Sequence, residues 1–208
     1  MYSSSDHRRR IWSPAGVCRS TNAPEISQRQ SVNSSAVLIV LCGLSFSGKS
    51  TVGQSLTKSF EASVVTLDAI NEERGLQCGQ GISLAEWRAT NDLAHERTEK
   101  LLRAGVCVVI DDSSSPRFLR DEWRTTASAI GARFGLVYVH ADPQMIRNRV
   151  CLNREDLTRP DVIDAVINEH TAQFEPPAID EPHHTIESTN SNNEAEVSAL
   201  VARISAIR

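Results

Sequence analysis

From residue 36 onward, short strand-like segments, of which Ala36–Cys42 is a continuous apolar run, alternate with longer segments of mixed polarity. A continuous apolar run of five to seven residues is typical of a strand that is buried on both faces of a parallel sheet. The segments that we expect to be strands are Ala36–Cys42, Ser63–Leu67, Val106–Ile110, Phe134–Val139 and His183–Glu187. Because helix-like segments separate them, the sequence predicts βαβ units, and hence an α/β fold with helices on both faces of the sheet.

Helix signals mark the segments between these runs. Ser83 precedes an amphipathic segment and Glu86 follows three residues later, which predicts a capping box. The residues after the second run, Asn71–Gly81, are polar and contain glycine, and we expect an exposed loop there. We also expect the charged segment Asn153–Arg159 to interrupt the helical pattern. The predicted helices are about Lys49–Phe60, Ser83–Arg103, Ser115–Ile130, Asp142–Cys151, Asp161–Phe174 and Asn193–Ile207.

Composition divides the chain at about residue 35. Residues 1–35 are rich in Ser, Asn, Arg and Pro, which predicts a disordered tail, with an organelle-targeting peptide as the alternative. We expect residues 36–208 to form one domain. The longest apolar run, Ala36–Cys42, is too short to span a membrane, and the net charge of −4 gives no general attraction to nucleic acid. Five scattered cysteines without a C-x-x-C spacing indicate a reducing cytoplasm.

One motif after the first predicted strand indicates nucleotide binding. Its sequence, Gly-Leu-Ser-Phe-Ser-Gly-Lys-Ser-Thr, matches G-x-x-x-x-G-K-[ST], with a strand before it and a helix after it. Glycines allow the backbone to approach phosphate oxygens, and successive N–H groups form an anion-binding nest. Lys49 supplies a charge to the phosphates of ATP, and Ser50 supplies a hydroxyl to Mg²⁺. The predicted ATP-binding residues of this motif are Gly43, Leu44, Ser45, Phe46, Ser47, Gly48, Lys49, Ser50 and Thr51.

Carboxylates follow two of the predicted strands. Ligands in open parallel sheets lie beyond the carboxyl ends of the strands, so these residues share an edge with the phosphate motif. Asp68 follows the second strand and is a candidate general base, with a helix N-cap as its alternative role. Asp111 follows the third strand in a Walker B-like pattern and is our candidate Mg²⁺ ligand, with Asp112 as the second choice and a plain turn as the alternative.

Arginines gather in the segment after the fourth predicted strand. Guanidinium groups pair with phosphates, so a segment that closes over ATP could stabilise the transferring charge. The alternative is a solvated helix face. We assign Arg154 and Arg159 to the closing segment and expect Arg147 and Arg149 on the helix that leads into it.

These motifs together resemble a known family. The runs LIVLCGLSFSGKST, TLDAI and VVIDDSSS, within roughly residues 36–180, are similar to small kinases often labelled AAA-type ATP-binding domains. That family is similar to the kinase domain of polynucleotide kinase and to chloramphenicol phosphotransferase. The resemblance implies a P-loop NTPase sandwich with five parallel strands in the order 2-3-1-4-5. It also implies Lys49 and Ser50 on phosphate and Mg²⁺, Asp68 as the general base and Arg154 on the ATP phosphates.

The chain departs from the family pattern at two places. Related sequences often carry Asp-Ala/Thr-Thr/Asn after the third strand, where this chain has Asp111-Asp112-Ser113-Ser114. Phe46 is bulky for a loop position that is usually small. Both departures leave ATP binding intact and bear on the acceptor and the metal geometry.

The resulting hypothesis is a cytoplasmic kinase, a monomer or homodimer, that uses ATP and Mg²⁺ to phosphorylate a hydroxyl of a small molecule. A second hypothesis keeps the chemistry but takes a 5′-hydroxyl nucleic-acid end as acceptor, which the acidic composition disfavours. A third is an ATP-binding regulator with little turnover.

Overall fold

The computed structural model describes residues 36–76, 81–156, 162–189 and 194–207. Within these ranges lies a five-stranded parallel sheet with the order β2-β3-β1-β4-β5, so the predicted fold class and strand order are confirmed. The predicted tail, residues 1–35, falls outside the described residues. The strands are β1 (Val37–Cys42), β2 (Ser63–Val65), β3 (Val108–Ile110), β4 (Arg133–His140) and β5 (His184–Glu187).

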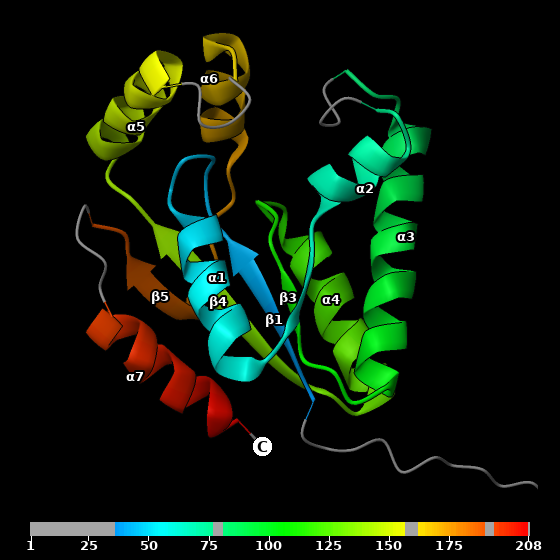
Figure 1. Cartoon of the computed structure of the whole chain (residues 1–208). Helices are drawn as coiled ribbons and strands as arrows, with labels where there is room; N and C mark the ends of the chain where they lie inside the picture. The colour runs from blue at the N-terminus through cyan, green and yellow to red at the C-terminus, as the bar shows by residue number, and fades with distance from the viewer. Residues whose placement is uncertain (1–35, 77–80, 157–161, 190–193, 208) are drawn as a thin grey trace, which may run out of the picture. The chain divides into compact units, whose positions relative to one another are not determined.

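Helices cover both faces of this sheet (Figure 1). Helices α1 and α7 lie on one face, and α3 and α4 lie on the other. Helices α5 and α6 lie beyond the carboxyl edge of the sheet, at the upper left of Figure 1. The helices among the described residues are α1 (Lys49–Phe60), α2 (Leu67–Glu73), α3 (Leu84–Arg103), α4 (Arg117–Ile130), α5 (Pro143–Asp156), α6 (Asp164–Gln173) and α7 (Glu194–Ser205).

The central strand β1 explains why the first apolar run is continuous. Leu38, Val40 and Cys42 pack into a cluster with residues of α3 and α4. The alternate residues of the strand pack into a second cluster with residues of α1 and α7. Successive side chains of a strand point to opposite faces, and both faces of β1 are covered, so all six positions are apolar and fully buried.

Two predictions about helices were wrong. The first concerned the start of the Asn71–Gly81 segment, where α2 continues through Glu73. Thr66 explains the difference, because its Oγ1 accepts a hydrogen bond from Ala69 N at 3.0 Å and so caps a helix immediately after β2. Asn71 is consequently buried, and its Oδ1 accepts a hydrogen bond of 2.6 Å from Thr90 Oγ1 of α3.

The second concerned the charged segment Asn153–Arg159, where α5 runs on to Asp156 instead of stopping near Cys151. Asn153 lies three positions after Val150 and seven after Ile146, which is helical spacing on the inward face, and all three residues are buried. The charged residues beside Asn153 point to solvent, so they do not end the helix. In contrast, the capping box predicted for Ser83 and Glu86 is present at the start of α3.

Candidate active site

The loop between β1 and α1, here called the phosphate loop (Gly43–Gly48), lies beside the loop that follows β3, here called the aspartate loop (Asp111–Ser115). The backbone N–H of Gly43 donates a hydrogen bond of 3.1 Å to the carbonyl of Ser113, which joins the two loops directly. A cavity of about 1040 Å³ opens at this edge of the sheet. Its lining includes Lys49, Ser50, Thr51, Asp68, Asp111 and Asp112.

Both glycines of the phosphate loop occupy places that a side chain could not fill. A Cβ at Gly43 would lie 2.6 Å from the carbonyl oxygen of Val139, and one at Gly48 would lie 2.7 Å from Ser188 Oγ. Gly48 also has a φ of 101° and directly precedes α1. Gly48 gives α1 no side-chain cap, and the positive end of the helix dipole at such a terminus favours an anion. The loop therefore fits a phosphate cradle.

Lys49 spans the phosphate loop. Its Nζ donates hydrogen bonds of 3.0 Å to the carbonyl of Gly43 and 2.8 Å to the carbonyl of Leu44. These contacts hold the ammonium at the rim of the cradle, beside the exposed residues Ser50 and Thr51. The arrangement places a positive charge and a hydroxyl at the beginning of one helix, as polyphosphate binding requires.

Phe46, a departure from the family pattern, has a structural explanation. Its φ of 64° is unusual for a bulky residue, and its ring is buried in a cluster with Ile146 and Val150 of α5. The carbonyl of Phe46 accepts a hydrogen bond of 3.0 Å from Arg149 Nη1. Burial of the ring and this hydrogen bond together offset the backbone strain, and they attach the phosphate loop to α5.

Asp68 is the second residue of α2 and lines the cavity. The alternative role that we considered for it, a helix N-cap, belongs to Thr66. The carboxylate is on the exposed first turn of α2 beside the cavity, which is where a general base for an incoming hydroxyl would have to lie.

The two aspartates after β3 have different surroundings. Asp112 Oδ2 accepts a hydrogen bond of 2.9 Å from Ser114 N, so its carboxylate holds a local turn. Asp111 is bound to the sheet by its backbone, through a hydrogen bond of 3.1 Å from its N–H to Val65 O. Both line the cavity. Hydroxyl and carboxylate oxygens are hard ligands, so Ser50 and Asp111 fit the preference of Mg²⁺.

The sequence reasoning missed Arg149 as a site residue. Arg149 lines the cavity, and beyond its contact with the phosphate loop it donates hydrogen bonds to Ser188 Oγ at 3.0 Å and Thr189 O at 3.1 Å. Partial burial lowers the pKa of its guanidinium below the ordinary value. One signal was present in the sequence, because Arg149 is three positions after Ile146 and so flanks the inward face of α5.

The structure places Arg154 elsewhere. Its Nη2 lies 2.7 Å from Asp164 Oδ1 and 3.1 Å from Val162 O, so it joins α5 to the start of α6. Arg154 is not among the described residues that line the cavity. Arg159, the other arginine assigned to the closing segment, lies outside the described residues.

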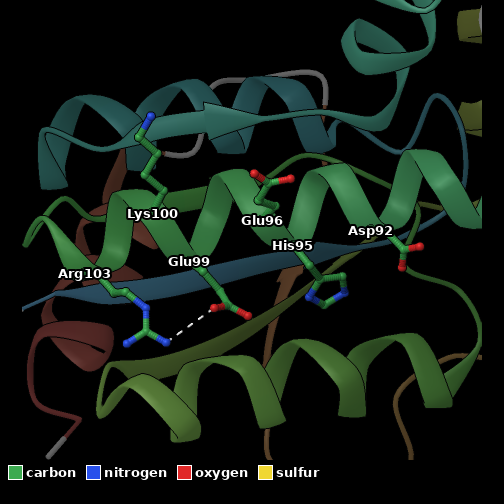
Figure 2. A pocket seen from close by; sticks show the side chains of 6 residues that line it. All are labelled: Asp92, His95, Glu96, Glu99, Lys100 and Arg103. Carbon is green, nitrogen blue, oxygen red and sulfur yellow. Dashed lines mark hydrogen bonds and ion pairs between the residues drawn. The ribbon is translucent and has the colours of Figure 1, made fainter.

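A second hollow, of about 530 Å³, lacks the arrangement of side chains that an active site needs. Figure 2 shows that all the side chains drawn around it project from one helix, α3. Arg103 pairs with Glu99 of the same helix at 3.4 Å. Polar groups from different elements do not converge on it, whereas the cavity at the sheet edge collects residues from seven separate segments of the chain. Its lining residues are Asp92, His95, Glu96, Glu99, Lys100 and Arg103.

Comparisons with known proteins agree with this geometry. Residues 38–177 match a family model described as AAA domain. A gluconokinase from Sinorhizobium meliloti 1021 has a similar structure, with a TM-score of 0.63 and 20% identity over 83% of this chain and 94% of that chain. None of the curated proteins matches the sequence.

Two further similar structures contain nucleotides. The APS kinase CysC from Mycobacterium tuberculosis, in complex with AMPPNP and APS, has a TM-score of 0.60 and 18% identity over 80% of this chain and 96% of that chain. Kti12 from Chaetomium thermophilum, in complex with ADP-AlF3, has a TM-score of 0.63 and 16% identity over 82% and 99% of the two chains. At these identities the likeness concerns the fold.

None of the described helices combines the length and apolar character that crossing a membrane requires. The cytoplasmic location and the oligomeric state that the sequence suggested stay predictions.

Proposed function

Because the chain belongs to the AAA domain family and shares its fold with small P-loop kinases, we propose that it transfers the γ-phosphoryl group of ATP to a hydroxyl of a small molecule. One observation carries the proposal. A single cavity gathers the phosphate loop, the first turn of α2 with Asp68 and the aspartate loop, from three different strand ends. Transfer to a hydroxyl calls for a general base beside the phosphates, and the carboxylate on α2 is the candidate.

The proposed mechanism assigns binding to the phosphate loop. Backbone N–H groups of residues 43–51, apart from those of Gly43, Ser47 and Thr51, which donate to carbonyls, would hold the β- and γ-phosphates together with the ammonium of Lys49. Ser50 and Asp111 hold Mg²⁺, which when bound neutralises charge on the phosphate oxygens. Arg149, between the phosphate loop and the segment after β5, secures the loop against the rest of the site.

Asp68 is the proposed general base. Its carboxylate orients the acceptor hydroxyl and accepts its proton as the oxygen attacks the γ-phosphorus, while the bond from phosphorus to the bridging oxygen breaks and ADP leaves. Arg154 and Arg159 stay the proposed arginines of a closing segment. For that role, Arg154 must exchange its contact with Asp164 for the phosphates.

Two variants test the proposal. Asp68→Asn should bind ATP as tightly as the unchanged chain and lose phosphoryl transfer by about 10²- to 10⁴-fold, since it keeps the shape and removes the base. Lys49→Ala should weaken ATP binding. Asp92→Asn and Lys100→Ala, on the outer surface of α3, are matched controls and should change neither quantity. Calorimetry gives the affinity, and release of ADP with a panel of hydroxyl compounds gives the transfer.

The alternatives predict other results. A regulator would bind ATP and keep its response to a partner in Asp68→Asn, with no compound in the panel stimulating ADP release. A kinase of 5′-hydroxyl nucleic-acid ends would bind oligonucleotides with an affinity that falls steeply with salt. Equal ATP affinities of Lys49→Ala and the unchanged chain would contradict all three functions.

A further inference from the structure

A buried ion pair lies directly behind the candidate site. Arg120 of α4 and Glu181, which precedes β5, form two parallel hydrogen bonds, Nε to Oε1 at 2.7 Å and Nη2 to Oε2 at 2.8 Å. Their side chains are 0% and 1% exposed. Removing two charges from water is costly, and an apolar pair would fill the same space, so such a pair is weak evidence of a role in stability alone. The remaining contacts of Arg120 indicate what else it does.

Those contacts are to backbone carbonyls of two segments. Arg120 Nη1 donates to the carbonyls of Ser114, at 3.0 Å, and of Ser115, both in the aspartate loop. It also donates to the carbonyl of Glu175 at 2.9 Å, two residues beyond the end of α6. The guanidinium of Arg120 therefore contacts three parts of the molecule: Glu181, the aspartate loop and the segment that follows α6.

The aspartate loop needs such support. Ser114 has a φ of 42°, which is strained for a residue with a side chain, and it is fully buried. Its N–H holds the carboxylate of Asp112, and the neighbouring Ser113 carbonyl accepts the N–H of Gly43. A shift of Ser114 would consequently move the aspartates first, because among the described residues the phosphate loop is joined to this segment through the one backbone hydrogen bond from Gly43 to Ser113.

A second set of contacts joins the aspartate loop to the same segment. Glu175 N donates a hydrogen bond of 3.1 Å to Ser115 Oγ, and Glu175 Oε2 accepts one of 2.9 Å from Arg117 N. Arg117 in turn pairs with Asp180 at 3.0 Å. The loop and the chain after α6 are thus connected through the backbone and side chains of Glu175, in addition to the contacts of Arg120.

We propose that Arg120 is a positioning residue that fixes the aspartate loop in the geometry that binds Mg²⁺, and that Glu175 couples this geometry to α6. The proposal rests on the proposed function only for the role of Mg²⁺. Glu181 keeps the guanidinium charged and oriented, and Nη1 donates to the carbonyls of Ser114, Ser115 and Glu175. The aspartates themselves need no contact with Arg120.

The principal test is Arg120→Lys in the full chain. Lysine keeps a positive charge beside Glu181. It lacks the planar guanidinium that pairs with Glu181 on one side and donates to three carbonyls on the other. We expect the affinity for ADP in EDTA to stay unchanged. The Mg²⁺ concentration that gives half of the metal-dependent gain in ADP affinity should rise about 10- to 100-fold, as for other residues that orient metal ligands. Calorimetric titrations of ADP at graded Mg²⁺ measure both.

Hydrogen exchange of the protein without nucleotide gives an independent measurement. In Arg120→Lys the amides of residues 111–115 should exchange faster, while those of β1 keep their protection. Arg97→Lys is the matched control, because Arg97 pairs with Glu73 between α3 and α2 on the surface. It should alter neither the Mg²⁺ requirement nor the exchange of residues 111–115.

A milder variant covers the case in which Arg120→Lys does not fold. Ser115→Ala removes only the hydroxyl that accepts Glu175 N, and it should accelerate the exchange of residues 111–115 and of Glu175. Unchanged exchange in Ser115→Ala and in any folded Arg120→Lys would overturn the proposal. So would a loss of ADP affinity in Arg120→Lys that is equal with and without Mg²⁺. If the unchanged chain bound no ADP, the proposed function would fail, while the exchange measurements would still decide the positioning role.

Discussion

The phosphate loop and the aspartate loop solve the same backbone problem in two ways. Each contains a residue other than glycine with a positive φ, Phe46 at 64° and Ser114 at 42°. In each, the carbonyl of that residue accepts a hydrogen bond of 3.0 Å from an arginine Nη1, Arg149 in the first case and Arg120 in the second. Strained loops at a functional site persist when their surroundings hold them, and here arginines supply part of that support.

The two arginines differ in what surrounds them. Burial is the largest single influence on the pKa of Arg120 and disfavours its charge, but the hydrogen bonds to Glu181 and the charges of neighbouring groups, Glu181 and Glu175 among them, together outweigh it, so the pKa is raised. Arg149 lines the cavity, contacts neutral oxygens of Ser188 and Thr189, and has its pKa lowered by burial. The comparison teaches that one arginine is committed to the fold, whereas the other can also meet a ligand.

The largest expected contrast is between Arg120→Ala and Arg149→Ala. Arg120→Ala leaves Glu181 buried and unpaired, which should cost about 3–5 kcal/mol of the free energy of unfolding. Arg149→Ala removes hydrogen bonds at a partly exposed site, and we expect a loss of roughly 1 kcal/mol. Urea unfolding measures both. Equal losses would show that the buried pair and the cavity arginine do not differ as the structure indicates.

Acid should also separate the buried ion pair of Arg120 and Glu181 from the exposed pair of Arg97 and Glu73. Hydrogen bonds from Arg120 lower the pKa of Glu181 below its ordinary value of 4.5. The folded state therefore gains stability that is complete above that value and is lost as the pH falls through the lower pKa of the folded state. Glu181→Gln should flatten the acid side of the stability profile in that window. We expect a smaller change from Glu73→Gln, since its partner Arg97 is exposed; a change as large as that of Glu181→Gln would contradict the assignment.

The smallest expected effect concerns backbone strain. Glycine accepts a positive φ without the cost that other residues carry, so Ser114→Gly should be about 1 kcal/mol more stable than Ser114→Ala. The hydroxyl of Ser114 has no hydrogen-bond partner among the described residues, so its removal in either variant should cost little stability. Thermal unfolding of the two variants measures the difference. A more stable alanine variant would show that Ser114 is not strained.

The sequence predicts those parts of the molecule that depend on residues close to one another in the chain. The burial of β1 follows from an apolar run, and the capping box of α3 from Ser83 and Glu86 at the right spacing. The positions of Asp68 and Asp111 at the cavity follow from the rule that ligands bind at the carboxyl ends of parallel strands.

The rest depends on contacts between distant residues. Arg120 reads in the sequence as one of several arginines on an amphipathic helix, and only the approach of Glu181, 61 positions later, makes it a buried ion pair. Asn71 is likewise buried because α3 brings Thr90 against it. Phe46 looked like a departure from its family, and the packing of α5 against its ring explains it. Spacing within one element cannot reveal such pairs.

The contacts of Arg149 join segments of this site that the ribosome makes at very different times. Its contacts join Phe46, 103 positions earlier in the chain, to Ser188, 39 positions later. Contacts between residues so far apart in sequence form late in folding, because a long loop must close first. A chain emerging from the ribosome therefore carries the phosphate loop long before it carries Ser188 and Thr189. Any binding of nucleotide to the finished site must consequently wait until the segment after β5 has been made.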